Sequence, residues 1–350
     1  MKIKLMEVEQ PIGTFYLGKM SMEQLMRISI INRRRNDSGT QRQIKDKKVN
    51  DIAYYCNDKD AVFPTPIILS VNTGKQLNKV MDGIYEFDID EKCKAEIIDG
   101  QHRFEGIKIA NLFDITLPVV IMFNLNDSEK AYIFSTINNN QTKVDKSLIY
   151  DLFGVAKDRS PYKTCHEIAK MLNTDPESPF CGRIKMLEKR QTEEEILSQG
   201  TFVTHLLTLI TNNPNFDTID SKNNKDIKDN INLVFRKYFI NNKDEVIAKI
   251  LMNYFSACKE IFSVEWEDAK YYILIKTTGY SGLIKALKIL VPFGEKNGDL
   301  SKEFFVKVFE HLKEKLSKEG KKLTSEFYPS GASGESSLCR DVVSFVSDSE

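Results

Sequence analysis

The spacing of apolar residues divides the chain into two parts. Up to residue 157, short apolar runs typical of strands alternate with segments whose apolar residues recur at helical spacing. The expected strands are Thr14–Met20, Pro66–Val71, Tyr85–Ile89, Ala95–Ile98 and Leu117–Phe123. The expected helices are Met22–Ile31 with Ser21 as its cap, Gln43–Tyr55, His102–Asn111, a helix capped by Asp127 that runs to Thr136, and Lys146–Lys157.

After residue 157 strand signals become sparse and helical spacing dominates. The helical segments are Glu167–Leu172, Phe202–Ile210, Ile227–Phe239, Val246–Phe262, Ser281–Leu290 and Ser301–Leu316. The polar stretch Asn212–Asp229 is rich in Asn, Asp, Lys and Ser, which predicts a surface loop. We therefore expect an α+β domain over residues 1–157 and a mostly helical domain over residues 158–350.

Composition narrows the function classes without identifying one. The 350 residues carry 50 basic and 50 acidic side chains, so any contact with nucleic acid must come from a local basic patch. The longest apolar runs, such as Leu117–Phe123, are too short to span a bilayer, and the N-terminus shows no signal peptide. We expect a cytoplasmic protein with no membrane partner. The 6 cysteines and 4 histidines are scattered, which argues against a zinc site and a disulfide framework.

One polar string, Asp99-Gly100-Gln101-His102-Arg103, lies between an expected strand and an expected helix. The first turn of a helix has unpaired N–H groups and the positive end of the helix dipole, and it therefore binds anions. Arg103 adds a fork of donors that fits phosphate oxygens, and His102 adds a ring donor. Asp99 is placed to hold Mg²⁺ or to orient the arginine. The alternative is an N-cap aspartate followed by exposed polar residues, and residue types alone leave both open.

The segment DGQHRFEG, Asp99–Gly106, resembles the signature of the DGQHR-domain family, which includes the DNA-phosphorothioation regulator DndB and members of deazaguanine DNA-modification clusters. Further resemblance lies in Thr40–Arg42, Phe63–Pro64, Phe134–Leu148, Ser160–Asn173 and Ser178–Met186. The resemblance implies a ParB/sulfiredoxin-like fold in the N-terminal domain, with this strand–turn–helix at the phosphates of a nucleotide. Sulfiredoxins carry a reactive cysteine where this chain has Gln101, and without that thiol their reductase chemistry has no nucleophile.

The same resemblance implies roles for individual residues. The residues implied in nucleotide binding are Gln41, Arg42, Gly100, Gln101, His102, Arg103, Asn138, Asn140 and Gln141. Those implied in catalysis are Asp99, His102 and Arg103, and Asp99 with Asn138 would hold Mg²⁺. The asparagine-rich segment resembles a ParB segment that faces the triphosphate and its magnesium, although Asn138 stands where ParB has a glutamate. From residue types alone, a solvated loop is the alternative.

Basic and glycine-rich segments offer further candidates. Arg33, Arg34 and Arg35 are the best candidates for contact with DNA, and a solvated basic loop is the alternative reading. Two Gly/Ser segments, Thr277–Gly282 and Ser330–Glu335, read as loops that enter helices, with anion binding the less favoured role.

Three functional hypotheses follow from these patterns and the resemblance. The first is a ParB-like protein that binds a nucleoside triphosphate with Mg²⁺, hydrolyses it slowly or not at all, and acts with a DNA-modification or phage-defence system. Its partners would be the nucleotide and either DNA or a DNA-modification enzyme. The second is a non-enzymatic, DNA-binding transcriptional regulator of a DNA-modification gene cluster. The third is a nuclease, which ranks last because no further acidic metal cluster is visible.

Overall fold

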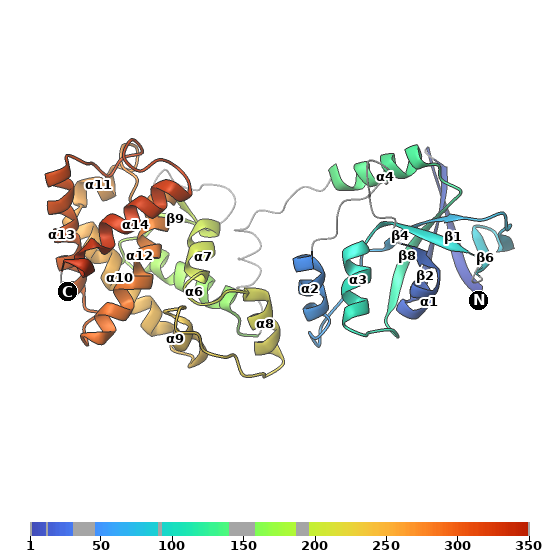
Figure 1. Cartoon of the computed structure of the whole chain (residues 1–350), viewed down its shortest axis with the longest axis horizontal. Helices are drawn as coiled ribbons and strands as arrows, with labels where there is room; N and C mark the ends of the chain where they lie inside the picture. The colour runs from blue at the N-terminus through green and yellow to red at the C-terminus, as the bar shows by residue number, and fades with distance from the viewer. Residues whose placement is uncertain are drawn as a thin grey trace. The chain divides into compact units, whose positions relative to one another are not determined.

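The computed structural model describes residues 2–11, 13–30, 46–89, 93–139, 158–186 and 196–348. The chain separates into two compact units, Met1–Lys143 and Val144–Glu350 (Figure 1). The domain boundary expected after Lys157 falls at the end of the stretch 140–157, which lies outside the described residues.

The N-terminal unit is built on an eight-stranded mixed sheet with the strand order β3-β7-β4-β8-β2-β1-β6-β5. The strands are β1 (Lys2–Gln10), β2 (Gly13–Ser21), β3 (Ser29–Ile30), β4 (Ile67–Asn72), β5 (Asn78–Met81), β6 (Ile84–Asp88), β7 (Lys94–Asp99) and β8 (Thr116–Phe123). β4 pairs in parallel with β8 and β3 in parallel with β7, while the other neighbouring strands are antiparallel. β1 was not expected, because only Ile3 and Leu5 of its residues are buried and the apolar signal is correspondingly weak.

The main core of this unit lies on one face of the sheet. Side chains alternate along β4, so that Ile67, Leu69 and Val71 share this face. The helices α1 (Met22–Ile28) and α3 (Gln101–Ile109) cover the face with side chains that include Leu25 and Phe104. Contacts of Phe104 with this core therefore hold the start of α3 in a fixed place on the sheet.

Ser21 caps α1 as expected, through a reciprocal capping box with Gln24. α2 (Asp46–Tyr55) packs against α3 at Gly106, where a Cβ atom would lie 2.5 Å from Ile52 Cγ2 and 3.1 Å from the carbonyl oxygen of Val49. A residue larger than glycine would push these two helices apart.

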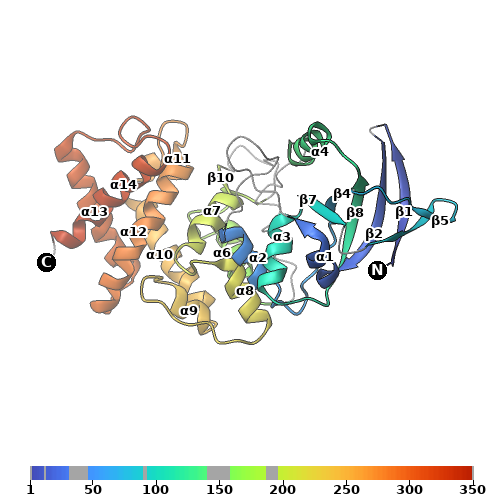
Figure 2. The ribbon, with the colours of Figure 1, turned by 45° about the vertical axis from the view of Figure 1, so that its right-hand side comes forward.

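The helix α4 (Asp127–Asn139) lies on the opposite side of the sheet from α1 (Figures 1 and 2). Its cap is Asn126, which exchanges hydrogen bonds with Glu129, so the expected cap at Asp127 was wrong by one residue. Asn126 is the cap because its side-chain oxygen accepts a hydrogen bond from the N–H of Glu129, which has no partner within the first turn of the helix.

The C-terminal unit is helical. Its helices are α6 (Pro161–Thr174), α7 (Gln199–Leu207), α8 (Pro214–Lys222), α9 (Arg236–Ile240), α10 (Asp244–Ile261), α11 (Ser263–Glu267), α12 (Thr277–Lys296), α13 (Lys302–Glu319) and α14 (Ala332–Ser347), and β9 (Ile184–Lys185) and β10 (Leu197–Ser198) form a short parallel pair. Aromatic rings fill its core, with Phe180 in edge contact with Phe202, Phe255, Trp266 and Tyr280. The expected α+β architecture with a mostly helical C-terminal part is confirmed.

Three local expectations in this unit were wrong. The segment Asn212–Asp229 contains α8, because Asn213 caps a helix with Pro214 in its first turn. The segment Ile227–Phe239 becomes helical only at Arg236. The residues Thr277–Gly282 lie inside α12, where tight packing against Ile273 replaces the expected loop.

Candidate phosphate-binding site

The turn between β7 and α3 has a geometry that requires glycine. Gly100 adopts the left-handed conformation with φ 97° and ψ 11°. A Cβ atom there would lie 2.5 Å from Ile67 Cδ1 and 3.2 Å from Arg103 Nη2. Both the backbone angles and the close approach of Ile67 and Arg103 therefore exclude a larger residue at this position.

α3 begins at Gln101 without a side-chain cap. The first N–H groups of an α-helix have no partner within the helix, and they point along the axis towards its start. The chain thus presents backbone donors and the positive end of the helix dipole at the exit of β7. An anion is the group that this arrangement accommodates best.

The guanidinium of Arg103 contacts the segment that leads into β4. Nη1 donates to the carbonyl oxygen of Thr65 and, over 2.6 Å, to the Thr65 hydroxyl. Nη2 donates to the carbonyl oxygen of Pro66 at 3.0 Å and to Oδ2 of Asp99 at 3.2 Å. Among the described residues these contacts engage both Nη nitrogens, and none engages Nε. Arg103 therefore ties together the end of β7, the start of α3 and the entry to β4.

The side chain of Arg103 is 19% exposed, against 30% for the side chain of Asp99. Burial lowers the pKa of the Arg103 guanidinium, and the carboxylate of Asp99 offsets part of that effect. Arginine remains protonated throughout the physiological range, so the site holds a partly desolvated positive charge. Three of the four oxygen atoms that bind this cation are uncharged, and its one carboxylate contact, with Asp99, is single and 3.2 Å long.

The other residues of the motif differ in exposure. Gln101 is 8% exposed, so its amide is largely withdrawn from solvent. His102 is half-buried, and Phe104 and Ile107 anchor the helix in the core. Phe104 and Ile107 therefore fix α3 in the core, while His102 and Arg103 in its first turn are only partly buried.

The structure brings only part of the expected site together. It groups Asp99, Gly100 and Arg103, with Gln101 and His102 in the same turn. Asn138 belongs to the last turn of α4, and its side chain is outside the described part of the chain. The remaining expected residues, Arg33, Arg34, Arg35, Gln41, Arg42, Asn140 and Gln141, lie outside the described residues.

Sequence reasoning missed Thr65 and Pro66, which contribute three acceptors to Arg103. They lie 38 and 37 residues before the arginine, and periodicity carries no information about such pairing. The only signal was the Pro-Thr-Pro string before the strand. A threonine that precedes a proline is restricted to extended backbone, so its carbonyl direction is largely preset.

Sequence reasoning also missed the ion pair that docks α4. Lys130 Nζ lies 2.8 Å from Glu96 Oε2 of β7, and the two side chains are only 7% and 15% exposed. Ser70 lies opposite Glu96 on β4, and its buried hydroxyl has no hydrogen-bond partner among the described residues. This polar patch lies on the sheet face opposite the main core.

Among the described residues, no three His, Cys, Asp or Glu side chains gather closely enough to hold a metal ion. A metal at this site would therefore depend on few protein ligands, as Mg²⁺ does when substrate phosphates complete its coordination. No helix within the described ranges is both long and apolar enough to cross a membrane.

Comparisons with known proteins place these features in context. One solved structure, that of the C-terminally truncated chromosome-partitioning protein ParB from Caulobacter crescentus complexed with CTP-gamma-S, is similar to 79% of this chain and 98% of its own, with 13% identity and a TM-score of 0.31. A search of curated proteins finds no match. The model of the DndB family, described as DNA-sulfur modification-associated, matches residues 3–261, which includes the whole β7–α3 site. The chain therefore belongs to the DndB family of proteins associated with DNA sulfur modification.

Proposed function

We propose that this protein binds the phosphates of a nucleoside triphosphate, together with Mg²⁺, at the turn between β7 and α3. The observation that carries the proposal is the uncapped start of α3 behind Gly100, with the half-buried guanidinium of Arg103 beside it. Backbone N–H donors, a helix dipole and a fixed cation act on the same small volume. The family match supports a DNA-modification context for the protein, and a role in phage defence belongs to the same proposal.

Each residue has a distinct role in the proposal. The N–H groups of the first turn of α3 donate to phosphate oxygens, and Gly100 lets the ligand approach the backbone. Gln101 contributes through its backbone because its side chain is buried. His102 adds a ring donor, and Arg103 supplies positive charge. Gln41 and Arg42, with Asn140 and Gln141, would complete the pocket.

Asp99 has two possible partners in the site. Its contact with Arg103 supports a role in orienting the guanidinium, and its remaining carboxylate oxygen suits Mg²⁺ together with Asn138. Mg²⁺ bound to phosphates would neutralise part of their charge. If hydrolysis occurs, the contribution of the chain is positioning and electrostatic stabilisation, because the turn carries no thiol, hydroxyl or amine side chain.

The test is a thermal-shift and calorimetry screen with ATP, CTP and GTP, each with Mg²⁺. We expect one nucleotide to raise the melting temperature and Arg103→Ala to abolish the response. Arg27→Ala is the matched control, because Arg27 is an exposed arginine of the same unit that pairs, within the described part of the chain, only with Glu23. No response to any nucleotide would refute the proposal.

The second candidate is a non-enzymatic DNA-binding regulator of a DNA-modification gene cluster, and the family match supports its DNA-modification context. Its proposed DNA contacts are Arg33, Arg34 and Arg35. Binding to a promoter that weakens steeply with salt, together with indifference to all nucleotides, would favour this candidate. Salt-insensitive binding that survives neutralisation of all three arginines would count against it.

A further inference from the structure

We propose that Thr65 is a positioning residue of the phosphate site: through two uncharged oxygen atoms it holds the guanidinium of Arg103 beside Gly100. The inference rests on the proposed function and adds a residue from a distant part of the chain. The Thr65 hydroxyl accepts a hydrogen bond from Arg103 Nη1 at 2.6 Å, and its carbonyl oxygen accepts a second one from the same nitrogen.

The backbone around Thr65 is suited to this role. Thr65 stands between Pro64 and Pro66, and Pro66 restricts Thr65 to extended conformations. The next residue, Ile67, is buried in β4 and lies under Gly100. The carbonyl groups of Thr65 and Pro66 therefore point at Arg103 from a rigid segment anchored in the sheet.

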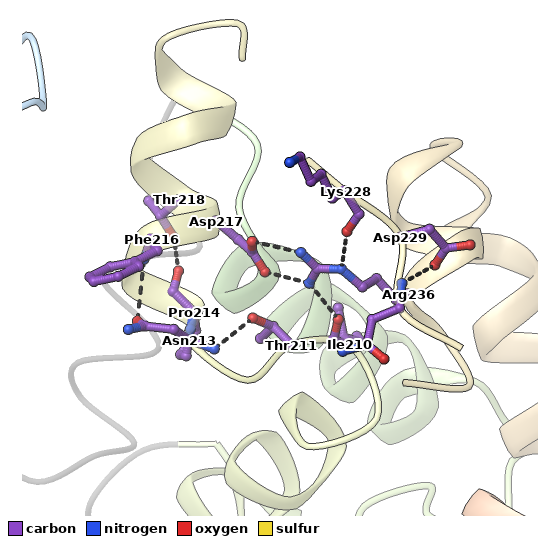
Figure 3. Close-up of polar contacts among 11 residues, drawn as sticks. Ile210, Thr211, Asn213, Pro214, Phe216, Asp217, Thr218, Lys228, Asp229 and Arg236 are labelled. Atoms are coloured by element: carbon purple, nitrogen blue, oxygen red, sulfur yellow. Dashed lines mark hydrogen bonds and ion pairs between the residues drawn. The ribbon is translucent and has the colours of Figure 1, made fainter. Parts of the chain in front are cut away.

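A second arginine, Arg236, is paired with a carboxylate through two hydrogen bonds and serves as a comparison. In the helical unit, Arg236 binds both carboxylate oxygens of Asp217, with distances of 2.7 and 2.9 Å (Figure 3). Its Nε and Nη1 also donate to the carbonyl oxygens of Lys228 and Ile210. Both side chains of that ion pair are buried, with Arg236 10% and Asp217 9% exposed.

Arg103 is bound differently. Its carboxylate contact is single and longer, at 3.2 Å to Asp99, and neutral oxygens supply its other contacts. Neutral acceptors fix the orientation of a guanidinium but leave its net charge in place. The contact of Arg103 with Asp99 is longer, engages one carboxylate oxygen and is more exposed than the pair of Arg236 with Asp217. This difference assigns Arg103 to a ligand and Thr65 to holding it in place.

The experiment measures binding of Mg²⁺ with ATP, CTP, GTP or inorganic tripolyphosphate by calorimetry. Thr65→Val removes the hydroxyl at constant shape, and we expect it to weaken binding about tenfold. Thr65→Ser retains the hydroxyl and should bind within about twofold of the wild type. Thr73→Val is the matched control, because the Thr73 hydroxyl accepts a local bond from the N–H of Lys75 and lies outside the site.

A double-mutant cycle separates positioning from general destabilisation. In the Arg103→Ala background, binding is measured by calorimetry at ligand concentrations above those of the thermal-shift screen. There Thr65→Val should weaken binding no further, because the group that it positions is gone. Equal weakening in both backgrounds, or wild-type binding by Thr65→Val, would overturn the positioning role alone. A wild-type protein that binds none of the probes would overturn the proposed function together with this role.

Discussion

Replacing Gly100 with alanine tests the geometry of the phosphate site directly. At φ 97° an L-residue is strained, which costs about 1–2 kcal/mol. The added Cβ would also lie 2.5 Å from Ile67 Cδ1, and Ile67 has little room to move because it is 1% exposed. Overpacking of this kind costs about 1–3 kcal/mol. We therefore expect the free energy of unfolding of the N-terminal unit to fall by about 2–5 kcal/mol.

Two other glycines of the same unit separate the backbone cost from the packing cost. Gly83 has φ 68° with nothing within 4 Å of an added Cβ, so Gly83→Ala carries only the backbone cost. Gly74 has open space and no positive φ in the left-handed region, so Gly74→Ala should be neutral or slightly stabilising.

The assay is hydrogen exchange of β4 and β7 peptides in a urea series. This readout is needed because the single tryptophan, Trp266, belongs to the helical unit and does not report on this one. If Gly100→Ala and Gly83→Ala lower the free energy of unfolding equally, the reasoning about the contact with Ile67 is refuted. A Gly100→Ala variant that also binds nucleotide normally would show that the turn is not the phosphate site.

Two further predictions concern buried ion pairs. Asp217→Asn leaves the buried Arg236 without its counter-charge and should lower the free energy of unfolding of the helical unit by about 3–5 kcal/mol. Trp266 fluorescence in urea measures this loss. The control is Glu23→Gln in an exposed pair, which should cost no more than about 1 kcal/mol as measured by hydrogen exchange of the α1 peptide. Equal losses of unfolding free energy in the two variants would contradict the reasoning. Lys130→Met should raise hydrogen exchange in α4 while β2 and β8 stay protected, because Lys130–Glu96 ties α4 to the sheet; unchanged α4 protection would contradict this. The hydrogen bond to Glu96 raises the pKa of Lys130 above its usual value, so Lys130 stays charged and α4 protection should persist from neutral to mildly alkaline conditions.

Local sequence signals were sufficient for much of the N-terminal fold. The proline stop before β4, the apolar run of β8 and the cap at Ser21 each depend on residues next to one another, and the structure places them as expected. The strand–turn–helix around Gly100 was visible for the same reason. Local polarity is misleading at α8, where the polar composition predicts a loop. The structure has a helix there, and its Asp217 is buried in an ion pair with Arg236 that no local pattern indicates.

The sequence by itself determined the chemistry at the end of β7: a glycine that permits the turn, a helix start that attracts anions, and an arginine one turn further on. Only the tertiary structure decided what that arginine contacts. Thr65 and Pro66 reach Arg103 because β4 lies antiparallel to β7, with Ile68 opposite Asp99. In the same way, α4 docks through Glu96 because strand alternation turns that side chain away from the core. Pairing between distant strands depends on which faces the whole sheet buries and on closing the long loops between the strands, and no local pattern encodes either.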